Sequence, residues 1–182
     1  NNIMSDFDIR QSLHYSTYIE HAKSLKIAAD ENLKLFLSFI EKPQNDEIRT
    51  KCIGLYNSTM LLYAVSVEIL MKGRGLYIEK EEIKNGTIEN YGQFMKRWGG
   101  HKDGHNFFKI IEHYKIPILE KHQKIFIELK SFTNWAGRFP FPKSENDTLI
   151  LENGKGKRGS LNKKYNDEIN LLFLEQINQM QY

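Results

Sequence analysis

Residues 60–71, MLLYAVSVEILM, are apolar at nearly every position and lie within a longer segment whose apolar residues recur every three or four positions. That spacing is the period of an α-helix, and a helix that is apolar on nearly all sides must be covered by several neighbours. Asn45 or Asp46 is a suitable N-cap, and Gly73 with Gly75 supplies a stop. We therefore expect a central buried helix packed by at least three others.

The rest of the chain has the same helical period, without sustained alternation of apolar and polar residues, so we expect an all-α fold. The other expected helices are 9–40 as one helix or two in line, a short helix capped by Asp103 and ending before Pro117, a helix opened by Pro117 and ending near Trp135, and a last helix from about Leu161 to Met180. Long connections are expected at 76–100, with one helical turn near 79–84, and at 137–160.

Length and composition are those of a globular protein with one domain. The chain has 182 residues, with 26 Lys and Arg against 23 Asp and Glu, which is long enough to bury a core without metals or disulfides. Cys52 has no partner within the chain, so we expect a reducing, cytoplasmic environment. There is no basic and apolar leader and no run of about 18 apolar residues, so we expect neither secretion nor a membrane span.

Three short motifs follow one another along the chain. They are Glu68 with Lys72 on the central helix, Gly104 with His105 opening the short helix, and Arg138 with Phe139 and Pro140 ending the next helix. In this order the motifs resemble those of one branch of the HEPN superfamily, over roughly residues 10–142. The resemblance implies a single domain over 1–182, with a HEPN-like bundle of four core helices at about 6–142 and a C-terminal loop and helix at 143–182.

The same resemblance implies function. HEPN domains commonly form homodimers and bind RNA or nucleotide, many act in toxin or defence systems, and many cleave RNA through an Arg and a His separated by four to six residues. No Arg and His in this chain have that spacing. Two functions therefore stay open: a domain that binds or cleaves RNA or nucleotide, and a non-catalytic domain that dimerises or docks a protein partner.

The candidate catalytic residues are Arg97, His101 and His105, which fall in a Gly-rich connection. An Arg with a His in such a loop could bind a phosphate and move a proton, although loops are often rich in Gly and charge without function. His101 and His105 also have the spacing of two metal ligands on a helix. The sequence offers no Cys pair or HExxH helix to complete a metal site, so we expect neither a metal nor a cofactor.

Charge and aromatic residues suggest a nucleic-acid surface in the second half of the chain. Residues 92–182 carry 15 basic and 10 acidic side chains, and the stretch 153–166, which includes Lys155, Lys157 and Arg158, contains no acid. It could contact phosphates, or it could be a solvated connection. Arg138 near Trp135 could stack on a base or grip a phosphate, or only cap its helix.

Two structural expectations complete the set. Glu68 and Lys72 are one helical turn apart on an apolar helix, where an internal ion pair would remove the cost of a buried unpaired charge. The 11 Phe and nine Tyr are more than we expect one small core to use, and this surplus, together with the HEPN resemblance, predicts a two-fold homodimer.

Overall fold

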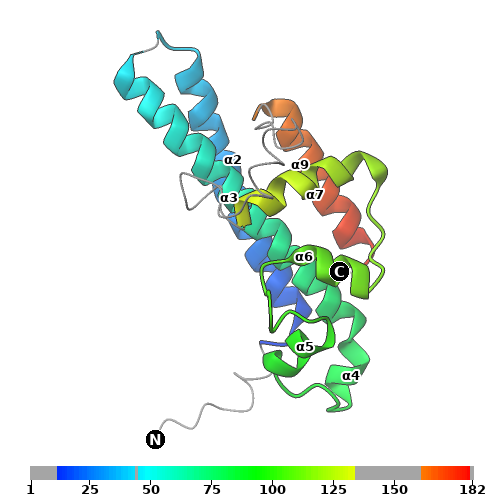
Figure 1. Cartoon of the computed structure of the whole chain (residues 1–182). Helices are drawn as coiled ribbons and strands as arrows, with labels where there is room; N and C mark the ends of the chain where they lie inside the picture. The colour runs from blue at the N-terminus through cyan, green and yellow to red at the C-terminus, as the bar shows by residue number, and fades with distance from the viewer. Residues whose placement is uncertain (1–11, 44, 134–160, 181–182) are drawn as a thin grey trace, which may run out of the picture.

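The computed structural model describes residues 12–43, 45–133 and 161–180, and within these ranges every regular element is a helix (Figure 1). The helices are α2 (Tyr15–Ile40), α3 (Asp46–Ile78), α4 (Lys80–Lys84), α5 (Tyr91–Arg97), α6 (Phe107–His113), α7 (Glu120–Ser131) and α9 (Lys163–Asn178). The expected all-α class is therefore confirmed, and no strand forms among the described residues.

Helices α2 and α3 form a long hairpin whose connected end projects beyond the other helices (Figure 1). The buried side of α2 carries residues spaced by three, four and seven, which places them on one face toward α3: Ile19, Ala22, Ala29, Leu33 and Phe36. At the turn, Asn45 caps α3, since its side-chain oxygen accepts a hydrogen bond from the N–H of Ile48 at 2.8 Å.

Helix α3 is the central helix of the fold, as expected. Tyr63, Val67, Leu70 and Met71 are fully buried on it, and it contacts α2, α4, α6, α7 and α9. The sequence prediction of at least three packed neighbours is confirmed. The physical cause is the apolar stretch, which leaves no side of the helix suited to water.

The expected end of this helix at Gly73 and Gly75 is wrong, because α3 continues to Ile78. A Cβ built at Gly73 would lie 3.2 Å from the Cβ of Tyr18, and one at Gly75 would lie 3.0 Å from the ring of Tyr114. These glycines let neighbouring helices approach the α3 backbone closely, which is a reason for glycine other than ending a helix.

The segment 76–100 contains more helix than expected. The turn near 79–84 is confirmed as α4, but α5 also forms there, with Asn90 accepting a hydrogen bond from the N–H of Gln93 at 3.0 Å. Helix α5 ends in a Schellman arrangement: the N–H of Gly100 donates to the carbonyl of Met95 at 2.8 Å, and Gly99 has φ +76°.

The starts of two later helices differ from the predicted residues. Helix α6 begins after Asn106 instead of Asp103, whose carbonyl accepts the Asn106 N–H at 3.3 Å and so belongs to a turn. Helix α7 begins at Glu120 and not at Pro117, because the Pro117 carbonyl accepts a hydrogen bond from Gln176 of α9 at 3.1 Å. The predicted end of this helix at Trp135 lies outside the described residues.

Helix α9 packs on the α2–α3 hairpin through a polar network, and its start agrees with the expected position. Asn166 donates to Asp30 at 2.6 Å and to the hydroxyl oxygen of Tyr63 at 2.8 Å. Tyr63 itself donates to Asp30 at 2.8 Å, and Lys26 pairs with the other Asp30 oxygen at 2.7 Å. The carboxylate therefore fixes the register of α2, α3 and α9 relative to one another.

Among the described helices, α3 alone is long and apolar enough to cross a bilayer, with a mean hydropathy of 1.3 over its best 18 residues. From the sequence we had expected no helix that meets this criterion. A core helix meets the same criterion, and 44% of that window is buried inside the fold. The apolar composition of α3 therefore agrees with its place in the core. The absence of a membrane span stays a prediction.

Candidate functional site

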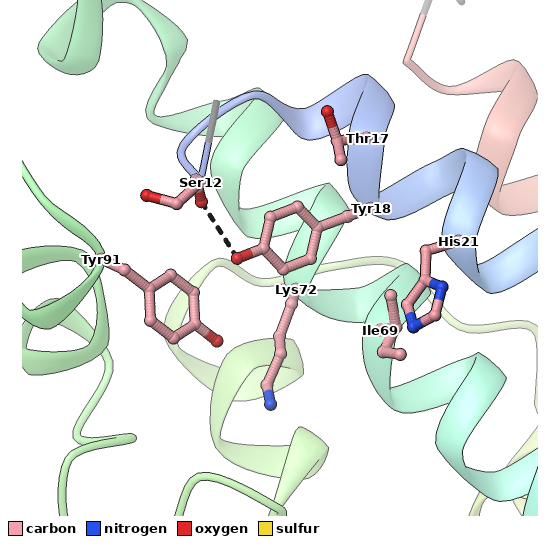
Figure 2. A pocket seen from close by; sticks show the side chains of 7 residues that line it. All are labelled: Ser12, Thr17, Tyr18, His21, Ile69, Lys72 and Tyr91. Atoms are coloured by element: carbon pink, nitrogen blue, oxygen red, sulfur yellow. Dashed lines mark hydrogen bonds between the residues drawn. The ribbon is translucent and has the colours of Figure 1, made fainter. Parts of the chain in front are cut away.

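A pocket of about 400 Å³ opens where α2, α3 and the start of α5 meet (Figure 2). Its lining comes from the residues before and in α2, from α3 and from α5: Ser12, Thr17, Tyr18, His21, Ile69, Lys72 and Tyr91. The size is in the usual range for a small-molecule site. The surface of the lining is mostly apolar and suits a flat ring, and its side chains also carry one ammonium group and several hydroxyls.

The two tyrosines are the main aromatic surface of this pocket. The rings of Tyr18 and Tyr91 have centroids 6.0 Å apart and planes inclined by 19°. The Tyr18 hydroxyl donates to the carbonyl of Ser12 at 3.0 Å (Figure 2). Burial, with Tyr91 nearby, raises the pKa of Tyr18 well above its usual value, so the phenol stays neutral at physiological pH.

Lys72 joins the pocket to a cluster of ionisable groups. Its ammonium lies 2.6 Å from Oε1 of Glu68, and Nδ1 of His105 lies 3.3 Å from both oxygens of the same carboxylate. The side chains of Glu68 and Lys72 are 5% and 12% exposed, whereas that of His105 is 58% exposed. The predicted ion pair on the central helix is confirmed, and His105 is added to it from the loop before α6.

Gly104 contributes to the placement of His105. A Cβ built there would lie 2.9 Å from Cε of Met95 and 3.3 Å from the carbonyl oxygen of Gly100. Glycine thus lets this turn lie against the end of α5. The first two motifs, separated by more than 30 residues in the sequence, therefore meet in space at Glu68.

Arg97 does not take part in this cluster. Its guanidinium donates twice to the buried carboxylate of Glu79, from Nε at 3.0 Å and from Nη2 at 3.2 Å. The Tyr114 hydroxyl donates to the same carboxylate at 3.0 Å. Hydrogen bonding to Glu79 raises the pKa of Arg97, so its charge is fixed. His101 is exposed, and its side chain makes no hydrogen bond or ion pair with the described residues.

Of the three predicted catalytic residues, the structure thus brings only His105 to a carboxylate of the candidate site. The helical setting of Arg97 also differs from the flexible loop that the glycines suggested, because Gly99 and Gly100 form the end of α5. The remaining candidate residues, Trp135, Arg138, Pro140, Lys155, Lys157 and Arg158, lie outside the described residues.

Sequence reasoning missed the pocket itself. Tyr18 and His21 are one turn apart on α2, and that spacing was visible, but nothing in it distinguished them from residues of an ordinary helix surface. Tyr91 could not be placed because α5 was not expected. No group of three or more His, Cys, Asp or Glu suited to a metal ion occurs among the described residues.

The chain matches no family model, and neither a curated protein nor a solved structure shows significant similarity to it.

Proposed function

We propose that this protein is a HEPN-like domain that binds RNA or a nucleotide in the pocket formed by Tyr18, Lys72 and Tyr91. The observation that carries the proposal is that two nearly parallel tyrosine rings and a lysine side chain line one pocket. A base has a flat π-surface that stacks on such rings, and a phosphate is attracted to the ammonium.

The lining suits one nucleotide unit better than an extended strand. Ile69 supplies apolar surface, and Ser12 and Thr17 supply hydroxyls that can bond to a sugar or a base edge. Base stacking on an aromatic side chain contributes about 1–3 kcal/mol and tolerates different bases. We therefore expect modest sequence preference.

We propose binding, and not cleavage, as the main activity of this site. The Arg–His spacing of the catalytic members is absent, and the Arg97 guanidinium is held by Glu79. Two histidines at the site could move a proton: His21 in the pocket lining, and His105, which contacts Glu68. Metal-independent cleavage that is lost in His105→Asn and kept in His21→Asn would assign that role to His105.

The test is an equilibrium titration with labelled short RNA and with a labelled mononucleotide, scoring binding and cleavage together, with and without divalent metal. Tyr91→Leu and Lys72→Gln should each weaken binding, and loss of one stacked base corresponds to roughly 5- to 150-fold. Tyr77→Leu is the matched control, since Tyr77 is another half-buried tyrosine outside the pocket lining. Unchanged affinity in both pocket variants would remove the proposal.

The basic loop adds a second part to the proposal, outside the described residues. If Lys155, Lys157 and Arg158 contact phosphates, their joint replacement by Ala should weaken binding of all RNA sequences alike and reduce the salt dependence. If the dependence of RNA affinity on salt concentration does not change, the loop is a solvated connection.

The alternative function is a docking domain without nucleic acid. An apolar groove of about 430 Å³ on the projecting α2–α3 hairpin favours it, with Leu35, Phe39, Gly54 and Leu55 in its lining. A protein that binds no RNA or nucleotide in the titration above, yet associates with itself or another protein through this groove, would fit the alternative.

A further inference from the structure

The charge balance around Lys72 limits how an anion can bind there. Glu68 is almost fully buried, and its carboxylate lies 2.6 Å from the Lys72 ammonium. The pair as a whole carries no net charge. A phosphate that approaches this ammonium from the pocket also approaches a buried carboxylate, and in a poorly solvated place that repulsion is large.

His105 is placed to offset this repulsion. Its Nδ1 lies 3.3 Å from both carboxylate oxygens of Glu68, and its ring reaches solvent, so a proton can be exchanged with water. A protonated imidazole is a cation that can pair with Glu68 while Lys72 turns to the phosphate. The site then carries one positive charge, which matches the single negative charge of a phosphodiester.

We propose that binding of a phosphodiester at Lys72 is coupled to the uptake of one proton by His105, with the Glu68 carboxylate linking the two groups. This inference rests on the proposed function of the pocket. Glu68 is then a positioning residue that makes the site respond to pH. The charged group that contacts His105 is Glu68 of α3, which is itself paired with Lys72, and the other titratable groups of the adjoining pocket are Tyr18, His21 and Tyr91.

The probe for the test is a fluorescently labelled dinucleotide that has one phosphodiester and no terminal phosphate. A phosphodiester does not change charge between about pH 6 and pH 8, whereas a terminal phosphate titrates near pH 6 and would add its own pH dependence. Imidazole ordinarily titrates within this interval. Any change of affinity with pH in this interval therefore comes from titration of groups in the protein.

For the unmodified protein we expect the dissociation constant to rise with pH, by at most about tenfold per pH unit for one linked proton. Glu68→Gln should bind the probe with no pH dependence and more tightly than the unmodified protein near pH 8, because the repulsion is gone. His105→Asn should bind weakly at every pH. His21→Asn, which changes the histidine in the pocket lining, should keep the pH dependence.

A second measurement needs no variant. Calorimetric titration in two buffers of different ionisation enthalpy should show a net uptake of protons near pH 7, of at most one proton per bound probe. Binding without a slope and without proton uptake would overturn the inference and leave the proposed function standing. A slope that survives in Glu68→Gln would also overturn it. No binding of the probe at any pH would remove both.

Discussion

Glu79 is a buried carboxylate directly after α3, and it accepts hydrogen bonds from Arg97 of α5 and from Tyr114 after α6. It thereby ties two segments to the end of the central helix, with partners 18 and 35 residues away. Hydrogen bonds that involve a charged group are among the stronger ones in proteins. The placement of α5, and so of Tyr91, depends on this contact.

Replacing Glu79 should therefore destabilise the fold. We expect Glu79→Ala to lower the free energy of unfolding by on the order of 2 kcal/mol, because the Tyr114 hydroxyl and the Arg97 guanidinium lose their acceptor. Glu31→Ala is the control, since the Glu31–Lys34 pair is largely exposed and should change stability by less than about 1 kcal/mol. Urea unfolding of both variants measures the difference. Equal stabilities would contradict this account.

Four tyrosines with raised pKa values allow a test of how stability depends on pH. Burial is the main cause of the raised pKa values of Tyr18, Tyr63, Tyr114 and Tyr165. The folded protein keeps these protons above about pH 10, where the unfolded chain releases them, so this stabilisation is lost as the pH rises further. Ultraviolet absorbance should show these phenols ionising together with alkaline loss of helical circular dichroism. Ionisation of every tyrosine near pH 10 with the helices intact would argue against it.

Helix α5 is the element that shapes the site, and its end depends on two adjacent glycines. Gly99 adopts a positive φ, and a Cβ on Gly100 would lie 2.1 Å from the ring of Trp98, which is buried. The indole therefore covers the Gly100 backbone directly. This geometry holds the turn that leads to Gly104 and His105.

We expect Gly100→Ala to destabilise the protein by roughly 1–3 kcal/mol, because the Trp98 ring must leave its place. Gly54→Ala on α3 is a matched control that should stabilise the protein. No atom lies within 4 Å of its added Cβ, and Ala favours helix over Gly by about 1 kcal/mol. Thermal unfolding distinguishes the two. A Gly100→Ala protein as stable as the unmodified one would show that the indole does not constrain this turn.

The helices with long apolar periods could be predicted from the sequence, and the finer elements could not. The central helix, α2 and α9 were expected because each repeats its pattern over several turns. The roles of the glycines were not, because the sequence does not show that Gly73 allows a close contact inside α3 whereas Gly99 supplies a positive φ at the end of α5. The Glu68–Lys72 pair was expected from local spacing, whereas the Tyr18–Tyr91 pair depends on tertiary contacts that no spacing reveals.

For the whole molecule, the homodimer stays a prediction, and the described residues do not support its aromatic argument. No Phe or Tyr in the described parts of the chain is exposed, and all of these except Phe39 pack in or against the core. The large exposed apolar residues are instead Ile and Leu: Ile27, Leu35, Ile40, Ile53, Ile78, Leu119, Ile127, Leu171 and Leu174. Among the described residues, these side chains are the exposed apolar ones that a shared surface could bury.

We expect light scattering at micromolar concentration to give about twice the mass of the 21.4 kDa chain. Leu35→Lys, in the lining of the apolar groove on the α2–α3 hairpin, should shift the protein toward the monomer if that groove is the interface. A species of 21.4 kDa at every concentration would contradict the dimer.

The most direct test of the central claim is to locate bound RNA on the protein. Short RNA that carries a photoreactive base, irradiated in complex with the unmodified protein and digested, should crosslink to the peptides that contain Tyr18 or Tyr91, because these rings are where we expect a base to stack. Excess unlabelled mononucleotide should suppress those crosslinks. Crosslinks found only on other peptides, with none at either tyrosine, would contradict the proposed pocket.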